Sequence, residues 1–170
     1  MTQIARRTFL VAVVVAPISS VAFAADALPD SRFVGFAETV NDFEIKSGQL
    51  ALTKSSNELV RGYAARAIAE HTAAAQSLSR NRSEAGVSMA PDEDVRRIAE
   101  DAMVRLNSFG GAEFDSAFAA AQLRVQAATV AQYGAYSQNG QSGPLRRYAQ
   151  EMLPKQEAFL EGAKRLVGAR

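Results

Sequence analysis

The chain of 170 residues has no cysteine and no tryptophan, and it has a single histidine. Without cysteine it cannot form a disulfide, a zinc–thiolate site, an iron–sulfur cluster or a thiol nucleophile. An excess of charge is also lacking, since 19 Lys and Arg are balanced by 18 Asp and Glu. Because the basic residues are scattered, we expect no nucleic-acid partner. A chain of this length predicts one domain that buries its own core.

The one long apolar run lies at the N-terminus and has the pattern of a signal peptide. Two arginines at 6–7 precede an apolar segment at 9–16, and Ala-Phe-Ala at 22–24 forms an A-x-A cleavage site. Pro17 and two serines interrupt the run well before the roughly 20 apolar residues that a membrane span needs. We therefore predict a signal peptide over 1–24.

Cleavage after Ala24 would leave 25–170 as a single domain without a membrane span, in the periplasm or secreted from the cell. An uncleaved membrane anchor is the alternative. The arginine pair followed by Phe9 and Leu10 also resembles a twin-arginine signal, which exports folded proteins. Ordinary secretory signals carry arginine pairs too, so both export routes stay open.

The chain after residue 25 is typical of helices. It is rich in Ala, Gln, Arg and Glu, and no segment keeps the alternation of a strand. Turn residues divide it into five predicted helices: one capped by Asp30 or Ser31 and running to about Ser55, one capped by Asn57 and running to about Ala85, a short one with Pro91 in its first turn that stops near Gly110, one over about 112–138, and one that starts after Gly143-Pro144 and continues nearly to the C-terminus. Pro154 predicts a kink or break in the last helix.

The four long helices each carry a stripe of apolar or small residues spaced by three and four. The predicted stripes are Phe33, Phe36, Val40, Phe43 and Leu50; Val60, Ala64, Ala67, His71, Ala74 and Leu78; Phe114, Phe118, Ala121, Val125, Ala128, Gln132 and Ala135; and Leu145, Ala149, Met152, Gln156, Phe159, Ala163 and Leu166. Such spacing keeps one face of a helix towards its partners in a bundle. We expect Tyr133, Tyr136 and Tyr148 at the rim, with their hydroxyls in water.

A short internal repeat supports two matched hairpins. The segment 60–64 (Val-Arg-Gly-Tyr-Ala) parallels 145–149 (Leu-Arg-Arg-Tyr-Ala), and each lies early in the second helix of its hairpin. Two hairpins joined by a long crossover have the connectivity of ferritin-like bundles. We therefore predict an all-α, ferritin-like four-helix bundle with a short extra helix in the crossover. The alternative is chance similarity between two Ala-rich helices.

Polar residues on or beside the stripes are the candidates for chemistry, namely Glu44, Glu70, His71, Gln126, Gln132, Gln156 and Glu157. A ferritin-type di-iron centre needs Glu-x-x-His pairs on two helices, which a chain with one histidine cannot supply. A single mixed site of His71 with Glu44 or Glu70 stays open, although adjacent residues point about 100° apart on a helix. The other interpretation is a buried His71 satisfied by Glu44 or Gln126, which fixes helix register.

Several short segments occur in order along the chain: 33–34, 43–45, 63–64, 70–72, 111–115 and Leu153-Pro154. Together they resemble the bacterial domain of unknown function 4142 family, which implies a secreted protein with a ferritin-like four-helix fold. That family has an Asp-His in the second helix, a His in the fourth and another His after the Leu-Pro. Here those positions hold Glu70-His71, Gln126 and Phe159, so two of the three imidazoles are missing. The resemblance implies no activity.

The sequence therefore predicts a binding centre of Glu44, Glu70, His71 and Gln126, with no catalytic residue, no metal and no cofactor, since no nucleophile elbow, oxyanion donor or phosphate loop accompanies His71. We expect a non-catalytic binding or structural module of the cell envelope, with a cell-envelope protein as candidate partner. This hypothesis predicts a dry, apolar bundle centre and a patch on the outer faces. The alternative is a degenerate ferritin-like protein with a weak metal or small-ligand site, which predicts a cavity beside His71.

Overall fold

The computed structural model describes residues 26–169, which form five α-helices. They are α1 (Asp30–Lys54), α2 (Glu58–Ala85), α3 (Glu93–Ser108), α4 (Gly111–Asn139) and α5 (Gly143–Gly168). The part of the chain so described contains no strand, so the all-α prediction is confirmed. None of these helices is long and apolar enough to cross a membrane. The predicted signal peptide over 1–24 lies outside the described residues.

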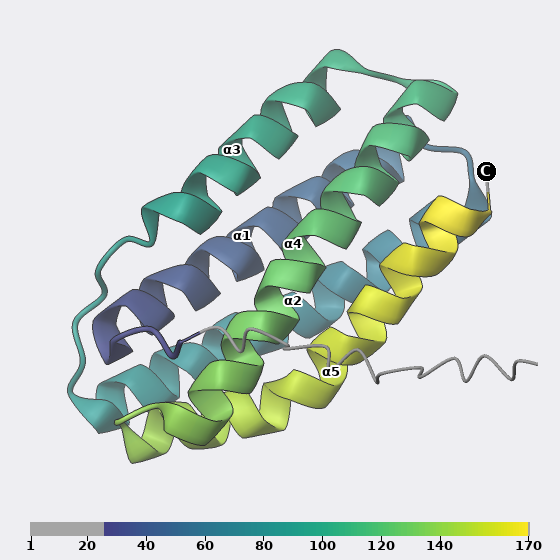
Figure 1. Ribbon diagram of the computed structural model, residues 1–170. Coiled ribbons are helices and arrows are strands. Elements are labelled where there is room, and N and C mark those ends of the chain that lie inside the picture. Colours follow the sequence, from purple (N-terminus) through teal and green to yellow (C-terminus); the bar gives the residue numbers. More distant parts are fainter. Residues whose placement is uncertain (1–25, 170) are drawn as a thin grey trace, which may run out of the picture.

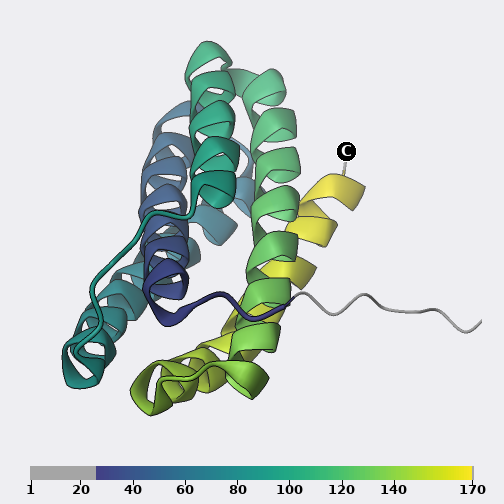
Figure 2. The same cartoon turned by 60° about the vertical axis from the view of Figure 1, so that its left-hand side comes forward.

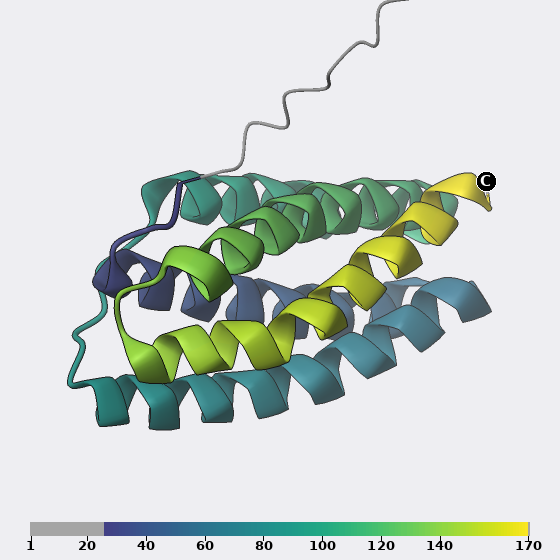
Figure 3. The ribbon, with the colours of Figure 1, turned by 60° about the horizontal axis from the view of Figure 1, so that its bottom comes forward.

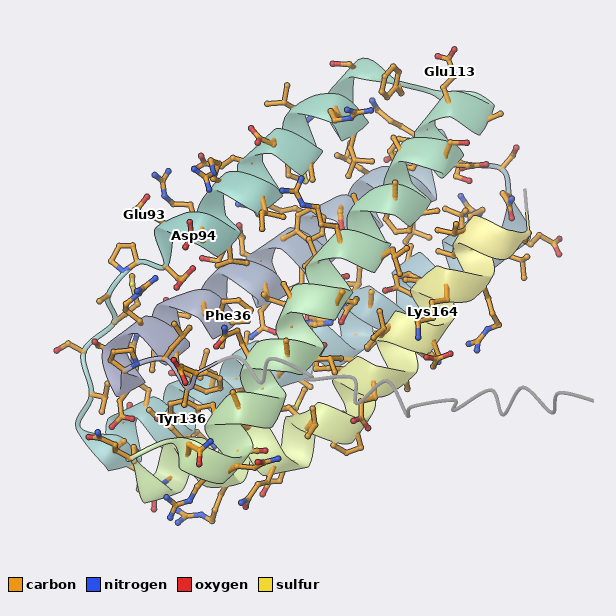
Figure 4. All side chains as sticks on the ribbon, in the orientation of Figure 1. Phe36, Glu93, Asp94, Glu113, Tyr136 and Lys164 are labelled. Atoms are coloured by element: carbon orange, nitrogen blue, oxygen red, sulfur yellow. The ribbon has the colours of Figure 1, made fainter. Side chains whose placement is uncertain are left out.

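The helices lie side by side along one common direction (Figure 1). α1 and α2 form one antiparallel hairpin, and α4 and α5 form a second. α3 lies between the hairpins in sequence and carries the chain back along the bundle, in contact with α1 and α4 (Figure 2). Because of this return, α2 and α4 run in the same direction. The predicted helix in the connection between the hairpins is confirmed, and at its start Glu93 and Asp94 project outward (Figure 4).

The start of α1 differs from the prediction. Its N-cap is Pro29, which gives no side-chain cap hydrogen bond, and neither Asp30 nor Ser31 caps the helix. The Asp30 carboxylate instead accepts hydrogen bonds from the Tyr136 hydroxyl and, at 3.3 Å, from the backbone N–H of Ser142. Its oxygen therefore links the start of α1 to the second hairpin, and this tertiary contact takes the place of a local cap.

The other helix ends follow local chemistry. Asn57 caps α2 and accepts from the backbone N–H of Leu59 at 2.9 Å, as predicted. Gly86 ends that helix with φ 63°, a left-handed conformation that favours glycine. α3 is capped by Asp92. Pro91 thus precedes the cap and does not lie in the first turn.

Pro154 does not break α5, which is continuous from Gly143 to Gly168. The carbonyl that loses its donor belongs to Gln150, which is exposed, so water can satisfy it. Figure 3 shows the axis of α5 changing direction about halfway along. The prediction of a kink is confirmed, and that of a break is wrong.

The predicted buried stripes hold on three helices and fail on one. Every predicted residue of α2 and α5 is buried, and on α1 only Leu50 is partly exposed. On α4 the buried residues are Phe114, Phe118, Ala119, Gln122, Val125, Gln126, Thr129, Tyr133, Tyr136 and Ser137, whereas the predicted Ala121, Ala128, Gln132 and Ala135 are half-buried. A strict 3.5-residue repeat drifts around a helix of 3.6 residues per turn. The prediction followed small alanines, while the helix buries glutamines and tyrosines one position away.

The three tyrosines are core residues, so their predicted place at the rim is wrong. Tyr133, Tyr136 and Tyr148 each have 0% exposure. Tyr133 and Tyr148 share a hydrogen bond between hydroxyls 3.2 Å apart, and the Tyr136 ring stacks on Phe33 with centroids 3.7 Å apart. Figure 4 shows Tyr136 at the end of the bundle where α1 begins. Because each hydroxyl has a protein partner, none needs water.

The two hairpins match in the loop and N-cap that join their helices. The sequence separation that relates Tyr63 to Tyr148 also relates Asn57, the N-cap of α2, to Ser142, the N-cap of α5. The loops between the helices, 55–57 and 140–142, therefore have equal length. The internal repeat in the sequence extends to the geometry of the hairpins.

Candidate functional site

The structure brings three of the four predicted site residues into the interior. Glu44 on α1, His71 on α2 and Gln126 on α4 each have 0% exposure. Glu70 does not join them, since it lies half-buried at the surface and pairs with Lys155 of α5 at 3.0 Å. Adjacent residues of a helix point about 100° apart, so burial of His71 turns Glu70 outward.

Glu44 lies at the middle of a hydrogen-bonded group. Its Oε1 accepts from Nε2 of Gln126 at 3.0 Å, and the side-chain amide of Gln122 lies 2.8 Å from both carboxyl oxygens. Burial raises the pKa of Glu44 to about 8, against the opposing effect of hydrogen bonds from the two glutamines. Glu44 is therefore a neutral carboxylic acid at pH 7, with a proton to donate.

That proton decides the orientation of Gln122. With Glu44 neutral, its O–H donates to Oε1 of Gln122, while Nε2 of Gln122 donates to Oγ of Ser47 at 3.0 Å. With Glu44 ionised, the amide must turn so that Nε2 donates to the carboxylate and its oxygen accepts from Ser47. The Tyr63 hydroxyl lies 3.2 Å from the amide oxygen. Protonation of Glu44 is thus coupled to the amide on α4.

His71 is held by a residue that the sequence analysis did not name. Its Nδ1 lies 2.9 Å from Oδ1 of Asn41 on α1, so the predicted partners, Glu44 and Gln126, are wrong. Burial lowers the pKa of His71 to about 4, opposed by the charge of Glu70. The neutral ring places its proton on Nδ1, which donates to Asn41. Nε2 is then an acceptor, and it has no partner within 26–169.

The matched positions of the second hairpin carry amides. The separation that relates the hairpins takes Asn41 to Gln126 and His71 to Gln156. Gln156 has 0% exposure, and neither polar atom of its amide has a partner among the described residues. A buried polar group without a partner costs about 1–3 kcal/mol. Water or a small polar ligand would satisfy such atoms.

Sequence reasoning missed Asn41, Ser47 and Gln122, all buried. A signal for the last was present, because Gln122, Gln126 and Thr129 follow one another at intervals of four and three on α4. That spacing places them on one face of a helix.

The sequence predicts either a dry, apolar centre or a cavity beside His71, and neither expectation for the interior holds in full. The centre is polar, contrary to the dry, apolar core expected of a binding module. Of four hollows found on the described part of the chain, none is lined by Glu44, His71 or Gln126, so no hollow among them matches the cavity predicted beside His71. Within 26–169 no three His, Cys, Asp or Glu residues are grouped to hold a metal ion.

Comparison with models of protein families shows the family to which the chain belongs. The family model described as Domain of unknown function (DUF4142) matches residues 17–166. The chain belongs to this family. The resemblance in the sequence is confirmed, and no curated protein or solved structure matched the chain. The description of the DUF4142 family gives no activity, so a role has to be argued from the geometry.

In this DUF4142 protein the interior group works by hydrogen bonding. At pH 7 the Glu44 carboxyl and the His71 imidazole are both neutral, with pKa values of about 8 and about 4. Each is bound by an uncharged side chain of another helix. Such contacts fix the register of α1 against α2 and α4.

Proposed function

We propose that the chain is an exported, non-catalytic, ferritin-like four-helix bundle that serves as a binding or structural module of the cell envelope. Export is supported by the signal-peptide pattern over 1–24. The ferritin-like arrangement is supported by two antiparallel hairpins joined by a crossover that α3 spans. The description of the family as one of unknown function is compatible with such a role.

One observation carries the non-catalytic part of the proposal. Glu44 and His71, with pKa values of about 8 and about 4, are fully buried, and neither of them lines any of the four hollows described above. An acid–base residue must come within hydrogen-bond reach of its substrate. The interior group therefore suits a structural role, and binding belongs to the outer surface.

A second candidate function is a weak metal or small-ligand site around His71. The unpaired Nε2 of His71 and the unpaired amide of Gln156, within the described part of the chain, favour it. The residues named for this site would offer a cation one imidazole, one carboxyl and amide oxygens, and the cation would have to displace the proton of Glu44. That donor set is poor for a transition metal and better for a small polar molecule.

Elemental mass spectrometry of the exported chain tests the metal form of the second candidate, and cell fractionation tests export. The protein is produced in a bacterial host with its own signal, and the periplasmic and culture fractions are compared with those from a chain that lacks 1–24. His71→Ala is measured beside Gln156→Ala, which removes the matched buried side chain. We expect export that depends on 1–24 and no stoichiometric metal in any sample.

Two results would contradict the proposal. Stoichiometric metal that is lost in His71→Ala and kept in Gln156→Ala would establish the second candidate in its place. A full-length chain that stays in the cytoplasm would exclude an envelope role.

A further inference from the structure

A groove of about 700 Å³ opens on the outer face between the first turns of α2 and the last turns of α5. Figure 3 shows that α5 turns away from α2 beyond its midpoint. The groove lies along this C-terminal half of α5. Its lining includes the apolar or small residues Leu59, Gly62, Tyr63, Gly162, Leu166 and Ala169. Leu59 is 60% exposed. The groove thus keeps apolar surface in contact with water.

The packing of the fold does not require glycine at position 62. A Cβ atom added there would meet no heavy atom within 4 Å. Glycine inside a helix costs about 0.5–1 kcal/mol relative to alanine. By contrast, a Cβ at Gly162 on the opposite wall would lie 3.0 Å from the Tyr63 ring, so packing explains that glycine. The groove supplies a reason for Gly62, since a side chain at this position would occupy part of it.

The charges at the groove favour an anion. Arg66 and Arg165 line it together with one acid, Glu58. Within 26–169 neither arginine forms an ion pair with a carboxylate. The guanidinium of Arg66 lies 4.6 Å from the ring centroid of Phe159, which holds it over the groove wall. A guanidinium is a planar fork of donors that matches a carboxylate.

We propose that this groove binds a small amphipathic carboxylate of the fatty-acid class. Its alkyl chain covers Leu59, Gly62 and Leu166, and its carboxylate contacts Arg66 and Arg165. This inference rests on the proposed role as a binding module and names the kind of ligand for it.

The extent of the groove favours a chain molecule over a partner helix. From Glu58 to Arg66 the groove follows α2 for about 12 Å, at 1.5 Å per residue. A docked amphipathic helix is itself about 10–12 Å wide and needs a continuous apolar stripe over two or more turns. Here a charged residue closes each end of the apolar part on α2. A narrow alkyl chain fits between those ends.

Isothermal titration calorimetry of the exported chain tests the ligand class with three probes, each below its critical micelle concentration or solubility limit. They are decanoate, decanol and decyltrimethylammonium, which share an alkyl chain and differ in headgroup charge. We expect decanoate to bind about tenfold or more tighter than the other two. Arg165→Gln should weaken decanoate binding about tenfold. Arg80→Gln, an exposed arginine of α2 outside the groove, should leave it unchanged.

A second pair of variants tests the place of binding. Gly62→Leu should abolish decanoate binding, whereas Gly134→Leu should keep it. Gly134 lies inside α4, also has no heavy atom within 4 Å of an added Cβ, and does not line the groove. Both substitutions raise helix propensity, so unfolding cannot explain a loss of decanoate binding. Equal affinities for the three probes, or unchanged binding by Gly62→Leu, would overturn the inference.

The outcomes stay separate from those of the proposed function. An exported, metal-free chain that binds no decanoate leaves the envelope role in place and removes only the groove. A chain that binds decanoate through Gly62 and Arg165 and yet stays in the cytoplasm removes the envelope role and keeps the groove.

Discussion

The two hairpins of this bundle have loops of equal length and differ in the chemistry that they bury. The first hairpin buries Glu44 and His71, whose pKa values are shifted to about 8 and about 4. The matched positions of the second hairpin hold Thr129 and Gln156, which do not titrate. The first hairpin therefore buries the carboxyl and the imidazole of the core, and the second hairpin supplies the uncharged partners of Glu44. Dependence of stability on pH should arise from the first hairpin.

The hairpins also differ in how closely their helices approach. A Cβ added at Gly48 would lie 2.9 Å from Cγ1 of Ile68, so α1 and α2 are in close contact there. The matched position on α4 is Tyr133, a fully buried ring whose hydroxyl meets that of Tyr148. The first hairpin is packed through a small residue and the second through aromatic rings. Matched loops thus leave the packing of each pair free to differ.

Removing the carboxyl of Glu44 should cause the largest change in how the free energy of unfolding depends on pH. Its pKa is raised from 4.5 to about 8, so between those values the folded state holds a proton that the unfolded state has lost. Stability due to Glu44 is complete below pH 4.5 and is lost as pH rises to 8, at about 1.4 kcal/mol per pH unit and about 5 kcal/mol in all. Glu44→Gln should abolish this decline. Urea unfolding at a series of pH values measures it.

Asp42→Asn is the control for that measurement, since Asp42 lies on the same helix and is exposed. It should leave the decline between pH 6.5 and 8 unchanged. The same decline in Glu44→Gln would show that another group causes it.

His71→Gln makes the first hairpin more like the second and has the next largest effect. The pKa of His71 is lowered from 6.5 to about 4, so its contribution is complete above pH 6.5 and is lost as pH falls to 4, by about 3 kcal/mol. In the wild type this loss opposes the gain from Glu44, and a plateau is expected between pH 4.5 and 6.5. In His71→Gln stability should rise as pH falls through that window, measured by the same urea series. A plateau that survives the substitution would contradict the assignment to His71.

The helices could be predicted from the sequence because their signals are local. Asn57 and Gly86 bound α2 through a side-chain cap and a left-handed turn, and both act within a few residues. The start of α1 could not be predicted in the same way, since Asp30 is occupied by Tyr136 from the far end of the chain. Such a contact has no local signal.

The candidate site was predicted in part for the same reason. His71 and Glu44 stand out as polar residues near apolar stripes, and both are buried. Their partners depend on how helices rotate against each other, which a stripe of alanines on α4 does not fix. Gln122 was missed and Asn41 was not weighed, although each completes a hydrogen bond of the centre. The buried face of α4 is set by packing against other helices.

The smallest effect concerns Gly62, whose matched position in the second hairpin is the exposed Arg147. Since an added Cβ at Gly62 meets nothing within 4 Å, Gly62→Ala should raise the free energy of unfolding by about 0.5–1 kcal/mol, measured by urea unfolding. Gly134→Ala should give a gain of similar size. Gly48→Ala should be destabilising, because its Cβ would press on Ile68. A loss of stability in Gly62→Ala would mean that the fold itself requires glycine at position 62. The groove would then not be needed to explain why the first hairpin has Gly62 where the second hairpin has Arg147.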